Sequence, residues 1–175
     1  MIEPDGKDWT WVIARACPEC GFVAAAHDPR DSGRVIREHA TRWTELLARP
    51  DASTRTRPDR WSVLEYGAHV RDVLVIYRGR LGRMIDEDDP LYENWDQDAT
   101  AAESHYSEQD PRVVAADLEV AAGSLAADFD AVEPDGWDRP GRRSDGASFT
   151  VTSFSRYLVH DLVHHVWDVT GEPAA

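Results

Sequence analysis

The feature that most constrains the fold is a set of four segments in which apolar residues recur with helical periodicity, bounded by helix start and stop signals. Ser62 and Glu65 have the spacing of a capping box. Asp110 is followed by a proline suited to a first helical position, and Gly171 is a natural stop. We expect helices at about 31–47, 62–85, 110–129 and from 152 to the stop at Gly171. Four such helices predict an all-α four-helix bundle.

Composition limits the class of protein. A chain of 175 residues with 42% hydrophobic content suits one globular domain. Its 33 acidic and 19 basic residues give a net charge of −14, which repels nucleic-acid phosphates and anionic membranes. Residues 1–5 lack the character of a secretory signal, and no apolar run is long enough to span a bilayer. We expect a cytoplasmic protein that binds neither nucleic acid nor membranes. Two copies of the chain could form a homodimer.

Histidines in two of the expected helices are the best functional clue. His160 and His164 would stand one turn apart, about 40° around the helix, and this spacing suits a metal. His69 lies at the edge of the apolar stripe of the second helix, so two packed helices could present three nitrogens to one ion. The spacing is equally consistent with a competing one-turn pair, Asp161 and His165. It is also consistent with the absence of a metal site, in which case these histidines are hydrogen-bonded core residues or surface residues.

Segments 61–69 and 157–165, which carry these histidines, resemble the DinB/YfiT-like superfamily of metalloenzymes, and the likeness spans roughly 31–171. In members with this pattern, the positions matching His69, His160 and His164 bind a divalent metal. The superfamily includes mycothiol-dependent maleylpyruvate isomerases and S-transferases that use mycothiol or bacillithiol. In those isomerases a glutamate takes the position held here by His160, which argues against the maleylpyruvate reaction itself.

The resemblance therefore implies a metal site made of His69, His160 and His164. We expect the metal to be Zn²⁺, with Ni, Fe or Mn as alternatives. Three imidazoles leave at least one coordination position of the ion open, and a thiol can bind there as a thiolate. We expect an enzyme that transfers or adds a low-molecular-weight thiol such as mycothiol to an electrophilic small molecule, or a thiol-dependent isomerase. The alternative is a non-catalytic metal- or ligand-binding stress-response module. A metalloprotease is disfavoured because Asp161 stands where its glutamate would be needed.

A second metal motif precedes the bundle. We expect residues 1–29 to form an extension and residues 30–175 to form the bundle. In the extension, Cys17 and Cys20 have the Cys-x-x-Cys-Gly form of one zinc knuckle. One knuckle supplies two ligands; His27 follows at a conceivable distance, and a fourth donor would come from elsewhere. A second, structural zinc site therefore competes with a reduced thiol pair, a disulfide or a tight turn.

Other residues could serve a site. Arg142 and Arg143 precede the fourth helix and could clamp a carboxylate of the substrate or cofactor, or they could belong to a solvated loop. Asp168 could orient an imidazole, although decoration of a helix end is the more common role. The long loop 86–109, rich in acids and aromatics, can cover a site.

Overall fold

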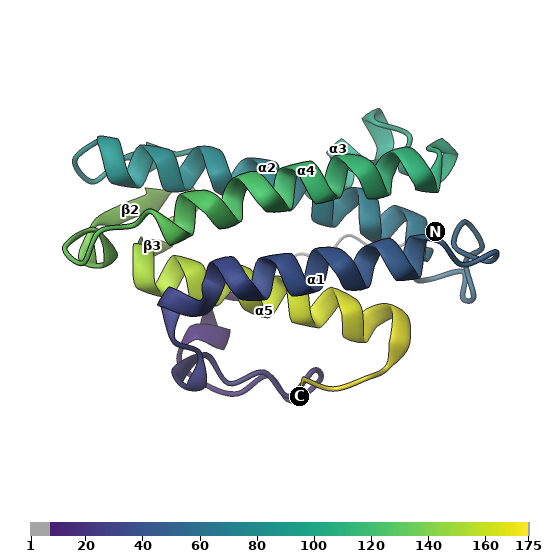
Figure 1. Ribbon diagram of the computed structural model, residues 1–175, viewed down its shortest axis with the longest axis horizontal. Coiled ribbons are helices and arrows are strands. Elements are labelled where there is room, and N and C mark those ends of the chain that lie inside the picture. Colours follow the sequence, from purple (N-terminus) through teal and green to yellow (C-terminus); the bar gives the residue numbers. More distant parts are fainter. Residues whose placement is uncertain (1–7, 175) are drawn as a thin grey trace.

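The four long helices lie side by side along the long axis of the molecule (Figure 1). The computed structural model describes residues 8–174, so residues 1–5, discussed above for the absence of a signal, lie outside the described part. The helices begin and end within one or two residues of the expected bounds, and the prediction of a four-helix bundle is confirmed. They are α1 (Ser32–Leu47), α2 (Val63–Asp86), α4 (Pro111–Asp130) and α5 (Val151–Thr170).

The helix ends are fixed by local signals in the sequence. The Ser62 hydroxyl accepts a hydrogen bond from the Glu65 amide (3.2 Å), and the Glu65 carboxylate accepts one from the Ser62 amide (2.9 Å), which completes the expected capping box. Asp110 caps α4, and Gly171 ends α5 with a φ of 74°. A second capping box, at Thr150, starts α5 one residue earlier than the sequence suggested. These end signals therefore fix where each helix begins, and with it the position of each candidate site residue along its helix.

The bundle core is made of large apolar side chains from all four helices. Helix α4 packs against α1 and α2, while α5 packs against α1 and α2 from the other side. Trp43 of α1, Leu118 of α4 and Phe154 of α5 are at most 1% exposed, and the Phe154 ring stacks on Tyr77 of α2 with centroids 4.5 Å apart. Burial of each such side chain contributes roughly 1.5–3 kcal/mol. The core therefore holds α2 and α5, which carry the candidate site, in fixed register.

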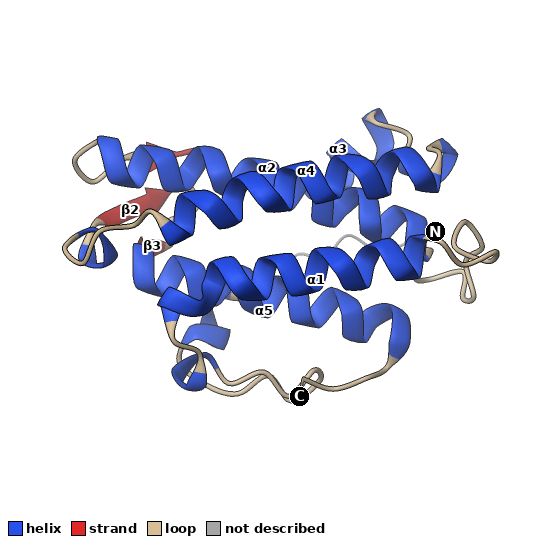
Figure 2. Ribbon diagram, viewed as in Figure 1, coloured by secondary structure: helices blue, strands red, loops and turns tan. Residues whose placement is uncertain are grey.

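The connections contain short elements that the sequence analysis did not resolve. A small sheet of order β1-β2-β3 lies at one end of the bundle, with β1 parallel to β2 and β2 antiparallel to β3 (Figure 2). The hairpin packs closely on α2, since a Cβ on Gly141 would lie 2.7 Å from Met84 Cγ. The elements are β1 (Leu91–Tyr92), α3 (Gln97–Glu103), β2 (Pro140–Arg143) and β3 (Ser148–Thr150), with 3-10 helices at Thr10–Ile13, Ala24–Ala26, Pro29–Asp31, Tyr106–Glu108 and Gly136–Asp138.

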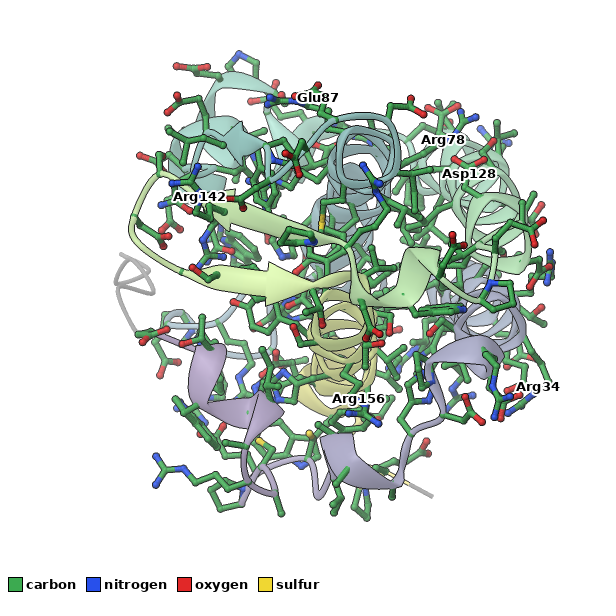
Figure 3. The ribbon with its side chains drawn as sticks, turned by 90° about the vertical axis from the view of Figure 1, so that its left-hand side faces the viewer. Arg34, Arg78, Glu87, Asp128, Arg142 and Arg156 are labelled. Carbon is green, nitrogen blue, oxygen red and sulfur yellow. The ribbon has the colours of Figure 1, made fainter. Side chains whose placement is uncertain are left out.

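The N-terminal segment, described from Asp8, lies along α5 (Figure 1). The Arg156 guanidinium of α5 donates to the His27 carbonyl (3.2 Å), and Arg156 is seen beside this segment in Figure 3. The Ala174 amide donates to the Cys20 carbonyl (2.6 Å), so the C-terminal end of the described chain also contacts this segment. Among residues 8–174, no helix combines the length and apolar character needed to cross a membrane.

Candidate metal centres

Helix α5 presents metal-binding side chains on two neighbouring faces. Successive residues of a helix point about 100° apart, so the pair His160/His164 and the pair Asp161/His165 face different surroundings. The first pair meets the N-terminal segment, where Cys17, Cys20, His160 and His164 each offer a donor atom within 4.8 Å of the others. The second pair meets α2, where His69, Asp161 and His165 do the same within 4.8 Å.

The metal set expected from the resemblance is therefore divided between two groups. His69 is not brought together with His160 and His164 among the described residues; its neighbours are the competing pair, Asp161 and His165. The physical reason is the rotation of α5 about its own axis, which turns Asp161 rather than His160 toward α2. We call the set on α2 and α5 the bundle site, and the set with the two cysteines the knuckle site.

The bundle site is enclosed by aromatic rings. His69 is 2% exposed, and its ring stacks on Trp95 with an interplanar angle of 8° and centroids 5.2 Å apart. Trp61 lies on it at 5.5 Å, and the His165 ring meets it edge-on at 4.7 Å. Trp95 belongs to the loop that was expected to cover a site, and it does lie over His69.

Nδ1 of His69 is a buried nitrogen atom without a hydrogen-bond partner in the described part of the chain. Nε2 of His165 makes no well-aligned hydrogen bond there, but it lies 3.3 Å from Oδ1 of Asp161, close enough for an ion pair when the imidazole is protonated. The same separation is typical of two ligands on one metal ion. Because a buried polar atom without a partner is destabilising by about 1–3 kcal/mol, His69 in particular fits a site for a cation, which would replace the proton of His165.

Asp168 orients the His165 ring. Its Oδ2 lies 3.0 Å from Nδ1 of His165, so the other ring nitrogen turns toward His69 and Asp161. The same carboxylate oxygen is 4.0 Å from Nε2 of His164, which places Asp168 between the two sites. From the sequence, decoration of a helix end is the more common role for a residue like Asp168. In the structure Asp168 orients an imidazole instead, because one helical turn brings it under both His164 and His165.

The electrostatics of the bundle site favour a positive charge. Burial lowers the pKa of His69 to about 3, so this imidazole is a neutral donor. Burial also acts to lower the pKa of His165, but the Asp161 and Asp168 carboxylates outweigh it and raise that pKa to about 10. Burial acts to raise the pKa of Asp161, yet the charge of His165 lowers it to about 2. Without a cation, a proton on His165 provides the charge that the carboxylates require.

The knuckle site is more completely buried. Its cysteines are at most 1% exposed, and His160 and His164 are 3% and 7% exposed. Cys17 Sγ lies 3.7 Å from Nδ1 of His164, and both cysteines are free thiols. The third donor considered in the sequence analysis, His27, lies elsewhere, because its Nε2 is 2.9 Å from the Ser32 hydroxyl.

A cavity of about 980 Å³ adjoins the histidines and the acidic residues of both sites. Its volume is at the upper end of the range for small-molecule sites. The wall combines aromatic side chains with three arginines and a larger number of acidic residues, so it can hold an organic molecule that has both apolar and polar groups. The aromatic and basic residues are Trp9, Trp61, Tyr66, Tyr77, Trp95, Tyr157, Arg60, Arg80 and Arg143, and the acidic ones are Asp8, Glu19, Asp59, Asp96, Asp98, Asp145, Asp161 and Asp168.

The two arginines predicted to bind a cofactor face different surroundings. Arg143 lines the cavity, pairs with Asp145 (2.9 Å) and places its guanidinium 5.8 Å from the centre of the Tyr157 ring. Arg142 is not among the lining residues; it is exposed and pairs with Asp89 at 2.9 Å on the outside of the hairpin (Figure 3). Adjacent residues of a strand point to opposite faces, so only Arg143 can contact a ligand in the cavity.

The fold and the two donor sets define a helical bundle with candidate metal centres. Residues 32–169 match the family model of the DinB superfamily, and the chain belongs to that superfamily. The resemblance seen in the sequence is thereby confirmed. Cys17 and Cys20 lie outside the matched region, so the knuckle site joins family residues to a segment that the family model does not cover.

Two solved structures share the fold. One is YfiT from Bacillus subtilis, described as a probable metal-dependent hydrolase with an unusual four-helix bundle topology; it is 19% identical with a TM-score of 0.74 over 82% of this chain and 84% of that chain. The other is a mycothiol-dependent maleylpyruvate isomerase, 12% identical with a TM-score of 0.62 over 84% of this chain and 62% of that chain. A comparison with curated protein sequences finds no significant match.

Proposed function

We propose that this protein is a metal-dependent enzyme that transfers or adds a low-molecular-weight thiol, such as mycothiol, to an electrophilic small molecule, or isomerises a substrate with the help of such a thiol. The observation that carries the proposal is the bundle site. His69, Asp161 and His165 come from two helices and converge within 4.8 Å at the wall of a cavity of about 980 Å³.

The residues of the bundle site fit a catalytic metal. Two imidazoles and one carboxylate are a ligand set used for Zn²⁺ and for Fe²⁺, and three protein ligands leave at least one position for a reactant. His69 and His165 each offer a ring nitrogen, and Asp161 offers a carboxylate oxygen. A divalent metal bound there would act as a Lewis acid and stabilise a thiolate at neutral pH.

The surrounding residues position and protect reactants. Asp168 holds the His165 ring in one orientation, which preserves the site between turnovers. Trp61 and Trp95 flank His69 and exclude water from that side. Arg143 offers a guanidinium to a carboxylate of the electrophile. A thiol and a small electrophile have room to lie together in the cavity.

The rotation of α5 also bears on the isomerase reading. The resemblance attributes a glutamate to the isomerases at a position that the sequence analysis matched to His160. In the structure the residue that faces His69 is Asp161, and it is followed one turn later by His165. A carboxylate and a histidine with this spacing remove the objection drawn from His160, so we keep the isomerase as one form of the proposal.

The experiment is a reaction screen with purified, metal-reconstituted protein. Mycothiol consumption and product formation are followed with a panel of electrophiles, including maleylpyruvate, with and without thiol. We expect thiol-dependent product from the wild type and at least a 100-fold loss in His69→Ala. His105→Asn is the matched control, because His105 is exposed, lies outside the cavity lining and adopts a positive φ of 50° that asparagine tolerates.

Three outcomes would contradict the proposal. Product formation by the wild type without thiol would point to a hydrolase, the description that YfiT carries. Saturable binding of thiol without product would support the non-catalytic binding module instead. Full activity in His69→Ala would show that the thiol-dependent reaction does not use the bundle site.

A further inference from the structure

We propose that Cys17, Cys20, His160 and His164 form a second metal site, a closed structural zinc site that fastens the N-terminal segment to α5. This inference stands apart from the catalytic proposal, because it depends on a different face of α5 and on residues outside the region that the family model matches.

The distances suit zinc. With Zn–S of about 2.3 Å and Zn–N of about 2.0–2.1 Å, a tetrahedral ion places its ligand atoms about 3.4–3.8 Å apart. Cys17 Sγ and His164 Nδ1 are 3.7 Å apart, within that range. All four donors already lie within 4.8 Å of one another, so side-chain adjustments of about 1 Å would complete the tetrahedron.

The backbone around the cysteines is shaped as a metal knuckle. The Cys17 amide donates to the Phe22 carbonyl and the Gly21 amide donates to the Cys17 carbonyl, each at 2.9 Å. Gly21 has a φ of +79°, a conformation that glycine adopts without strain. This turn brings both thiols to the side of the segment that faces α5.

The helix supplies the other two donors from successive turns. Nε2 of His160 is buried and makes no hydrogen bond, and the residue is 3% exposed. His164 directs Nδ1 toward Cys17, while its Nε2 lies 3.8 Å from the Glu19 carboxylate and 4.0 Å from that of Asp168. A metal-bound imidazole whose other nitrogen faces a carboxylate is the usual arrangement in zinc proteins.

The donor chemistry assigns different roles to the two sites. Two thiolates and two imidazoles select zinc over the harder divalent ions and occupy all four positions, which is the pattern of a structural site. The bundle site, with three donors and a cavity, keeps a position open. Helix α5 thus carries a closed site on one face and an open site on the next.

The zinc would lie inside the contact between the N-terminal segment and α5. In this contact Cys17, Cys20, Phe22 and Ala24 pack with Val159, and tryptophans of both elements lie around them. The same segment supplies Trp9, whose ring centroid is 4.9 Å from that of His164, and Glu19 to the cavity wall. Zinc at the knuckle site would hold this wall beside the bundle site.

The test is zinc content after dialysis of the full-length protein against a mild chelator. We expect the wild type to keep about one equivalent of zinc, Cys17→Ser and Cys20→Ser to lose it, and His69→Ala to keep it. His27→Ala is the matched control, because this nearby histidine lies outside the site and should leave the zinc content unchanged. A cysteine variant that keeps its zinc, or a wild type whose two cysteines form a disulfide, would overturn the proposal.

A second measurement covers the case in which the cysteine variants fail to fold. X-ray absorption at the zinc edge, recorded on the dialysed wild type and on His69→Ala, should show two sulfur and two nitrogen scatterers around the ion. A coordination shell without sulfur would refute the knuckle site whatever the variants do. Neither readout involves turnover, so a failure of the catalytic proposal would leave this result unaffected.

Discussion

Replacement of Glu65 by alanine tests how the start of α2, and with it His69 one turn later, is held. The Glu65 carboxylate accepts hydrogen bonds from the Ser62 amide (2.9 Å), the Ser62 hydroxyl (2.8 Å) and the Arg55 guanidinium (2.8 Å). Loss of the capping interaction costs about 1 kcal/mol, and the buried Ser62 amide left without a partner costs about 1–3 kcal/mol. We therefore expect Glu65→Ala to lower the free energy of unfolding by about 2–4 kcal/mol and Tm by roughly 5–15 °C.

Urea denaturation and thermal melts at pH 7 provide the assay, with Arg55→Ala as the matched control. The Arg55 side chain is 41% exposed, so its loss should cost under about 1 kcal/mol. Burial acts to raise the pKa of Glu65, but hydrogen bonds from Arg55 and Ser62 outweigh it and lower that pKa. The stabilisation is thus complete above the ordinary glutamate pKa of 4.5 and declines as the pH falls through the lowered value. Equal effects of the two variants at pH 7 would show that the capping bonds of Glu65 do not stabilise the start of α2.

Three further predictions concern the bundle site and the core. Asp168→Asn should weaken the binding of Mn²⁺ to the bundle site about 10- to 100-fold in a titration. Mn²⁺ is chosen because the thiolates of the knuckle site disfavour this ion. An unchanged affinity would contradict the orienting role of Asp168. Arg143→Ala should raise KM for an electrophile that carries a carboxylate about 10-fold in steady-state kinetics, whereas Arg142→Ala should leave this KM unchanged. Equal effects of the two variants would reject the assignment of Arg143 to the cavity. Phe154→Ala should lower the free energy of unfolding by about 3–5 kcal/mol in urea, against at most about 0.5 kcal/mol for the exposed Val120→Ala.

The bundle could be predicted from the sequence because its signals are local. The capping box of Ser62 and Glu65, the cap at Asp110 and the stop at Gly171 each act within one turn of chain, and the structure places helix ends at all of them. The hairpin formed by β2 and β3 was missed because its strands are only four and three residues long, too short for an alternating pattern.

The grouping of the metal donors could not be read in the same way. Apolar residues surround most of α5, with Leu158 and Leu162 on one side and Val159 and Val163 on the other, so periodicity does not fix the rotation of the helix. A change of one residue in register exchanges His160 for Asp161 at the bundle site. The decisive partner, Cys17, lies 147 residues from His164, a separation that no local pattern reports.

One signal in the sequence could have led to the observed grouping. The cysteine pair supplies two ligands and requires two more, and His160/His164 is a pair with suitable spacing. Once these two histidines are assigned to the cysteines, Asp161 and His165 remain for His69. Counting the donors that each motif needs, together with the competing one-turn pair, would have favoured two sites over one.

Anomalous diffraction at the zinc edge, from crystals of the full-length protein grown with zinc, would locate both metal sites at once. We expect two peaks per chain, beside two neighbouring faces of α5. One should lie among Cys17, Cys20, His160 and His164, and the other among His69, Asp161 and His165. A single peak bound by His69 together with His160 or His164 would contradict this arrangement.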